Sequence, residues 1–212
     1  MRDCVFLLAD SNMKGAFEGF FSREAFYHSI GCGPFRFTAS EDLVVAAGDN
    51  DPGLFTRGHE LLRPYRQTHQ YALVVLDAAW EGSPGAERIR QKVSTNLLES
   101  GWSQDRFHVV VIEPELETWI WQQNPHVATA LGFDDVETLM ADDLLARAWS
   151  AGQPKPSNPK ETLETLLRKK RIPRSSAIYQ KITSKVSVRQ CQDASFLAMV
   201  EILRGWFPEV VP

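Results

Sequence analysis

Acidic residues follow four apolar runs of this chain, and this arrangement is typical of a metal site. The runs at residues 4–9, 43–48, 71–76 and 107–112 lead, in that order, into Asp10, Asp49 with Asp51, Asp77, and Glu113 with Glu115 and Glu117. Carboxylates that lie together repel one another unless they share a proton or a cation. Oxygen ligands of this kind suit hard divalent ions. The sequence therefore predicts a Mg²⁺ (or Mn²⁺) site wherever these runs end together.

The apolar runs themselves predict the elements that bring the acids together. Short continuous apolar runs, separated by segments with helical spacing, are typical of buried parallel strands. In an open parallel sheet the carboxyl ends of the strands lie along one edge, where binding sites form. We therefore expect an α/β fold with a mostly parallel central sheet of about four strands, flanking helices and a helical C-terminal region.

The segments between and after these runs predict the helices. Apolar spacing, capping residues and proline positions place them at 13–21, 52–67, 84–100, 115–122, 134–149, 160–170 and 193–206. The segment from Ala151 to Pro159 contains three prolines and reads as a linker. The sequence therefore predicts an α/β domain at 1–150 and a basic helical region at 151–212 packed on it.

Not all of the acids are equally good candidates. Asp10, Asp77 and Glu117 are the predicted catalytic and metal-binding residues. Glu81 and Glu115 are predicted to complete the metal shell, with Glu113 nearby. Asp49 and Asp51 are weaker candidates because Asp51, followed by Pro52, is predicted to cap a helix. Asp10 could also cap the helix that follows it, but Asn12 can cap that helix instead.

Positive charge is concentrated late in the chain. Residues 155–189 hold ten Lys or Arg and two Glu, a net charge of +8, whereas the rest of the chain carries −12. A basic face on an acidic body suits DNA or RNA, although most charged segments are only solvated surface. The residues predicted to hold a nucleic-acid backbone are Lys169, Lys170, Arg171 and Arg174.

Composition and motifs exclude several classes of protein. No apolar stretch approaches the roughly 20 residues of a membrane helix, and three scattered cysteines form neither a zinc motif nor a disulfide framework. We expect a cytoplasmic protein that does not bind membranes. The chain has no phosphate-binding glycine loop of the Walker type, no H-E-x-x-H and no G-x-S-x-G.

Three short motifs resemble those of a known family. Asp10, Asp77 and the string Glu117-Thr118-Trp119 are similar in order and position to the acidic motifs of Toprim-like proteins in bacterial defence islands, which are similar to the nuclease half of OLD-type enzymes. The chain looks especially like a small component of methylation-associated phage-defence systems. The resemblance implies a Mg²⁺-dependent nuclease fold and partners encoded in a defence operon.

The chain also departs from the family pattern. The first acid is Asp10 rather than Glu, and Ser11 stands where a Gly is expected. The second motif, Asp77-Ala78-Ala79, lacks its second Asp, for which Glu81 is the nearest substitute. A site that lacks one ligand binds a metal less well.

Three functions fit these observations. The first is a Mg²⁺-dependent, Toprim-like nuclease that cleaves phosphodiester bonds in phage defence. The second is a non-catalytic Toprim-like subunit that binds partner proteins or nucleic acid, with Trp206 and Phe207 on its contact surface. The third is a receiver-like domain phosphorylated at Asp77, but the sequence offers no fifth strand with the Lys that this would require.

Overall fold

A computed structural model describes residues 1–46, 48, 50–189 and 191–209. It confirms the predicted α/β fold, with a four-stranded, all-parallel sheet in the order β2-β1-β3-β4. The strands are β1 (Arg2–Leu8), β2 (Leu43–Val45), β3 (His69–Asp77) and β4 (Phe107–Ile112). Each of them lies within or close to one of the predicted apolar runs.

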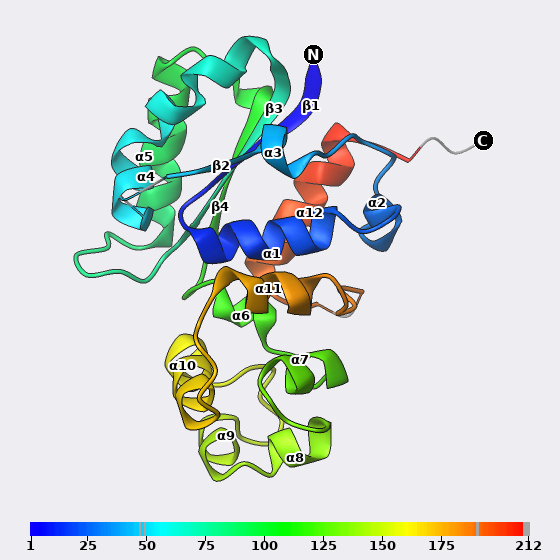
Figure 1. Ribbon diagram of the computed structural model, residues 1–212. Coiled ribbons are helices and arrows are strands. Elements are labelled where there is room, and N and C mark those ends of the chain that lie inside the picture. Colours follow the sequence, from blue (N-terminus) through cyan, green and yellow to red (C-terminus); the bar gives the residue numbers. More distant parts are fainter. Residues whose placement is uncertain (47, 49, 190, 210–212) are drawn as a thin grey trace.

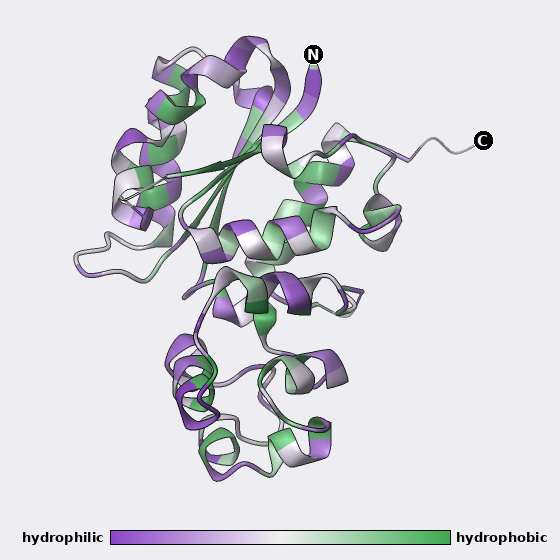
Figure 2. Ribbon diagram, in the orientation of Figure 1, coloured by the Kyte–Doolittle hydropathy of each residue, from purple (hydrophilic) through white to green (hydrophobic). Residues whose placement is uncertain are grey.

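Both faces of the sheet are covered by helices (Figure 1). One face is covered by α1 (Ser11–Phe21) and α12 (Ala194–Trp206), and the other by α4 (Asn50–Leu62) and α5 (Ala86–Glu99). Cys4 to Leu8 of β1 are at most 1% exposed, because this central strand is covered on both faces. The strands are accordingly apolar in their central parts, although β1 and β3 begin with polar residues, whereas the outer helices alternate between polar and apolar residues (Figure 2).

The sheet has a topological switch point between β1 and β3. From β1 the chain passes through α1 to β2 on one side, and it returns through α4 to β3 on the other side of β1. The helices that follow β1 and β3 therefore leave toward opposite faces of the sheet (Figure 1). In open α/β sheets, ligands usually bind beyond the carboxyl ends of the two strands at such a switch point.

Short helices fill the connections. They are α2 (Phe26–Ser29), α3 (Ala39–Asp42), α6 (Glu117–Ile120), α7 (Pro125–Ala130), α8 (Val136–Met140) and α9 (Asp143–Ala148), with 3-10 turns at Arg63–Gln67 and Gln104–Arg106. The single helix predicted at 134–149 is two helices, because Asp142 is extended and its side chain caps α9 at the N–H of Leu144. The helix predicted at 115–122 is reduced to the single turn of α6.

The residues after 150 are distributed over two places in the molecule. Helix α10 (Pro159–Lys169) contacts α9 and α6, and α7 to α10 form the lobe drawn below the sheet in Figure 1. Helix α11 (Ser176–Thr183), which has no counterpart among the predicted helices, packs along α1, and α12 packs on β4. Helices α11 and α12 thus belong to the α/β body.

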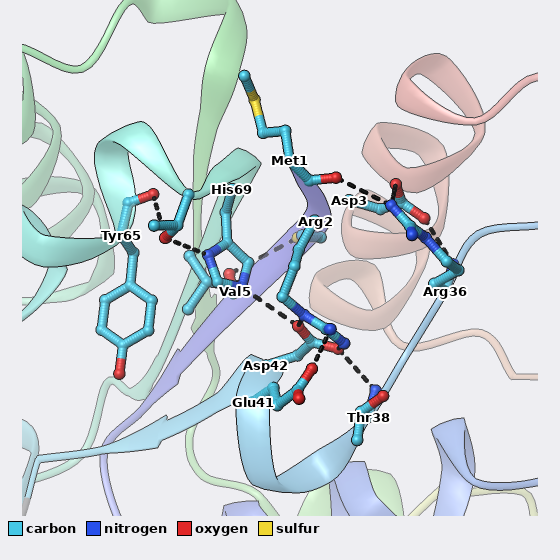
Figure 3. Close-up of polar contacts among 12 residues, drawn as sticks. Met1, Arg2, Asp3, Val5, Arg36, Thr38, Glu41, Asp42, Tyr65 and His69 are labelled. Atoms are coloured by element: carbon cyan, nitrogen blue, oxygen red, sulfur yellow. Dashed lines mark hydrogen bonds and ion pairs between the residues drawn. The ribbon is translucent and has the colours of Figure 1, made fainter.

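A buried ionic cluster ties the sheet together at its amino end, opposite the switch point (Figure 3). Asp42 is 1% exposed and accepts two hydrogen bonds from Arg2, at 2.5 and 2.8 Å. Its carboxylate also accepts the N–H of Thr38 at 2.6 Å and lies 3.2 Å from Nε2 of the buried His69. One carboxylate therefore links the starts of β1, β2 and β3.

Candidate functional site

The predicted acids Asp10 and Asp77 lie at the carboxyl ends of the two strands that flank the switch point. Asp10 follows β1 and is the N-cap of α1, where its Oδ1 accepts the N–H of Met13 at 2.8 Å. The expectation that Asn12 caps this helix is therefore wrong. A side-chain oxygen at the cap position satisfies an N–H that would otherwise have no partner inside the helix. Asp10 thus stabilises the start of α1 at the same edge of the sheet as the other acids.

Asp77 is the last residue of β3 and is 7% exposed. Its Oδ1 accepts the N–H of Leu116 at 2.8 Å, and its own N–H donates to Oδ1 of Asp51 at 2.7 Å. Asp51 was expected to cap a helix, but α4 begins at Asn50 and Asp51 lies inside its first turn. The Asp51 carboxylate contacts β3 instead. Asp51 therefore belongs to this site, although the local sequence pattern predicted only a capping role for it.

Electrostatics confirm that these carboxylates influence one another. Burial raises the pKa of Asp77 well above its ordinary value, and the charges of Asp51, Glu117 and Asp10 raise it further, in that order. Burial also raises the pKa of Asp51, with a smaller contribution from Asp10. The Lys160 ammonium acts in the opposite direction on both groups. Asp77 is therefore a carboxyl group that favours a proton or a nearby cation.

Glu117, the third predicted acid, already has protein partners. It is 1% exposed at the start of α6, and its Oε1 accepts hydrogen bonds from Nη2 of Arg174 at 2.7 Å and from the Tyr179 hydroxyl at 2.5 Å. Arg174 also donates to Glu164 at 2.9 Å and to the Tyr179 oxygen at 3.0 Å. Burial and the Glu117 charge raise the pKa of Tyr179, which keeps it a hydrogen-bond donor.

The remaining predicted ligands lie at the margin of the site. Oε1 of the half-buried Glu115 accepts the N–H of Lys160 at 3.0 Å, and burial raises the pKa of Glu115. Glu81 and Glu113 are exposed. Asp49 lies outside the described residues. The predicted acids thus differ in their surroundings: Asp77 and Glu117 are buried, Glu115 is half-buried, and Glu81 and Glu113 are exposed.

The described acids are not arranged as a metal site. Their oxygen atoms are suitable donors for Mg²⁺ or Mn²⁺. However, among the described residues no group of three or more His, Cys, Asp or Glu side chains is placed to hold a metal ion. Asp10, Asp77 and Glu117 each accept a hydrogen bond from the protein, and Glu117 is bound to a cationic side chain. The arrangement is a set of neighbouring carboxylates whose hydrogen-bonding capacity is partly used by groups of the protein itself.

The predicted nucleic-acid contacts also have partners within the protein. Nζ of Lys169 lies 2.6 Å from Oδ2 of Asp142, and the ammonium of Lys170 lies 3.8 Å from the centre of the Phe133 ring. Arg174 is bound to Glu117 and Glu164. Arg171 follows α10 with a positive φ of 57°. Three of the four side chains therefore stabilise the helical lobe or the acidic edge.

The aromatic residues proposed as a contact surface are half-buried and pack against other aromatic rings of the protein. The Trp206 ring stacks on Tyr71 with centroids 4.6 Å apart, and Phe207 stacks on Phe35 with centroids 4.3 Å apart. Nε1 of Trp206 donates to the carbonyl of Asp105 at 3.2 Å. These contacts hold the end of α12 against the body.

Comparison of the chain with protein-family models, with curated proteins and with solved structures gives no match. None of the helices in the described part of the chain has the length and apolar character needed to cross a membrane.

Proposed function

We propose that this chain is a component of a bacterial anti-phage defence system and acts there as a non-catalytic, Toprim-like subunit that binds other proteins of the defence operon. The defence assignment is supported by the resemblance of Asp10, Asp77 and Glu117-Thr118-Trp119 to the Toprim-like motifs. The proposal includes a cytoplasmic location, where such complexes meet phage nucleic acid.

The observation that carries the non-catalytic assignment is the Glu117–Arg174 ion pair. The resemblance makes Glu117 a metal ligand, yet a guanidinium and a tyrosine hydroxyl hold its Oε1 at 2.7 and 2.5 Å. Because Glu117 is 1% exposed, an incoming cation must compete with partners that are already in place. A buried carboxylate paired in this way stabilises the fold and is a poor ligand for a second cation.

Proteins are better candidates than nucleic acid for the binding partner. Lys169 and Arg174 are paired with acids, which removes much of the charge that would attract a phosphate backbone. Of the ten Lys and Arg residues at 155–189, four contact other parts of the protein through their side chains: Lys155, Lys169, Lys170 and Arg174. Partner proteins of the operon remain the partners that the resemblance implies.

A Mg²⁺-dependent nuclease is the second candidate, and the crowding of carboxylates around Asp77 favours it. The charges of Asp51, Glu117 and Asp10 all oppose ionisation of Asp77. A divalent cation held by Asp10, Asp51 and Asp77 would relieve this repulsion, and such ions are common in phosphodiester hydrolysis. This candidate requires the acids to move closer together than the structure places them.

Calorimetry with Mg²⁺ and with Mn²⁺ separates the two candidates. The proteins to compare are the wild type, Asp77→Asn and, as a control, Asp105→Asn in the 3-10 turn before β4. We expect no specific binding to any of them, and we expect cells carrying Asp77→Asn in the intact operon to keep full protection against phage. Metal binding that is lost only in Asp77→Asn, together with lost protection, would replace the proposal by the nuclease.

The partner is tested directly by affinity purification of the tagged chain from cells that express the whole operon. Co-purification of another operon protein in stoichiometric amount is the expected result. If the chain purifies alone both before and during infection, a subunit role is wrong.

A further inference from the structure

A cavity of about 660 Å³ lies away from the acidic edge, where three loops meet. The loops are residues 121–124 after α6, 149–155 after α9, and Ser187 with residues 191–193 before α12, and they contribute most of its lining. This volume lies within the range of about 300–1,000 Å³ that is usual for small-molecule sites.

Carboxamide side chains are concentrated in this cavity. Fifteen of the 212 residues are Asn or Gln, and five of these line it: Gln122, Gln123, Asn124, Gln153 and Gln192. Asn124 caps α7 through the N–H of His126 at 2.9 Å. The four glutamine side chains make no hydrogen bond to the described residues. One third of the carboxamides of the chain thus line a single cavity, most of them with their hydrogen-bonding groups available.

A carboxamide places a donor and an acceptor side by side. This pair matches the edge of a nucleobase, which is why Asn and Gln bind adenine through two hydrogen bonds. Several such groups around one cavity suit a planar ligand that carries both donors and acceptors on its rim.

The cavity also holds one cation that retains hydrogen-bonding capacity. The ammonium of Lys155 donates to the carbonyl of Trp121, and an ammonium has three donors, so two remain. Asp193 also lines the cavity, and its Oδ1 accepts hydrogen bonds from Nε1 of Trp119 and from the N–H groups of Ser195 and Phe196, each at 3.0 Å. The lining therefore combines carboxamides with the Lys155 ammonium, which has donors available for a phosphate, and with the Asp193 carboxylate, whose negative charge acts on Lys155.

We infer that this cavity binds a nucleoside monophosphate, with the base against the glutamine carboxamides and the phosphate near Lys155. The inference is independent of the proposed subunit role, because none of the acids at the switch point takes part. A ligand here would touch Thr118, the residue next to Glu117 in α6.

Isothermal titration calorimetry with AMP, GMP, CMP and UMP tests the inference on the full-length protein. We expect at least one of them to bind with a submillimolar Kd, and the double variant Gln122→Ala/Gln153→Ala to bind it about tenfold more weakly. Gln104→Ala is the matched control, because Gln104 is an exposed glutamine outside the cavity. Thermal unfolding checks that each variant is folded, and Gln192→Ala replaces the double variant if that does not fold.

Three results would overturn the inference. The first is that none of the four nucleotides binds at millimolar concentration. The second is that the cavity variants bind as tightly as the wild type. The third is that inorganic phosphate binds as tightly as the nucleotides, which would leave the carboxamides without a role in recognition.

Discussion

Nη2 of Arg174 lies 2.7 Å from Oε1 of Glu117, although 57 positions of sequence separate the two residues. The pair joins the segment before α11 to the first residue of α6, at the acidic end of the sheet. Because Glu117 is 1% exposed, the pair provides the charge compensation that its carboxylate requires. The Tyr179 hydroxyl completes the arrangement from one turn into α11.

Arg174→Met should lower the free energy of unfolding by about 3–5 kcal/mol, because it leaves a buried carboxylate without its cation. Adding Glu117→Gln to this variant removes the unpaired charge and should recover most of the loss. Urea unfolding followed by circular dichroism measures both. Equal stability of the single and double variants would show that Glu117 does not depend on Arg174.

Asp77→Asn should make the protein more stable at pH 7. The pKa of Asp77 is raised in the folded state, so the folded protein holds this proton more tightly than the unfolded chain. The stabilisation from this group is complete below the unfolded pKa and is lost as the pH rises through the folded pKa. An asparagine keeps an oxygen for the N–H of Leu116 and carries no charge.

The stability difference between Asp77→Asn and the wild type should therefore shrink as the pH falls toward 4. Denaturant unfolding at several pH values between 4 and 8 measures it. A difference that stays constant across this range would mean that Asp77 does not titrate with a raised pKa.

Gly15→Ala should separate α11 from α1. A Cβ atom at Gly15 would lie 2.3 Å from the carbonyl oxygen of Ser176, and backbone cannot move aside as a flexible side chain does. Overpacking of this kind costs about 1–3 kcal/mol. Gly205→Ala in α12 is the control, since no atom lies within 4 Å of its added Cβ, and it should stabilise the protein by about 0.4–1 kcal/mol. Chemical denaturation measures the free energy of unfolding of both variants. An equal change in the two variants would contradict the close approach of α11 to Gly15.

Asp42→Ala should destabilise the amino end of the sheet strongly. It leaves the Arg2 guanidinium and His69 without their shared acceptor, and losing one partner of a buried pair costs about 3–5 kcal/mol. Glu41 also pairs with Arg2, but its side chain is 54% exposed, so Glu41→Ala should cost less than about 1 kcal/mol. Thermal or urea unfolding that finds the same loss for both variants would rule out a special role for Asp42.

The sheet was predictable because β1, β3 and β4 are largely buried on both faces and therefore leave continuous apolar runs, while the half-buried edge strand β2 is apolar as well. The run at 107–112 coincides with β4, and the other three runs overlap their strands. Parallel strands place their carboxyl ends on one edge, so Asp10 and Asp77 were expected to lie close to each other. The fold class and the location of the candidate site followed from these two facts.

The partners of the acids were not predictable, because they come from distant parts of the sequence. Asp51 binds the backbone of Asp77 across 26 positions, and Glu117 meets Tyr179 across 62. No local pattern encodes such contacts. The capping pattern predicted Asp51 to be the N-cap of a helix, and that prediction is wrong. The burial of Ile178, Tyr179 and Ile182 on one side of α11 does leave a helical pattern, which would have located that helix.

The contact between α11 and α1 has a consequence for the order in which the protein is completed during synthesis. A ribosome makes all four strands before it reaches Arg174 and Tyr179. Until then Glu117 lacks both of these partners, and the groove on α1 at Gly15 and Gly19 is not yet covered by α11. A nascent chain that ends before residue 174 thus has every strand of the sheet but an acidic edge with a different charge from that of the finished protein.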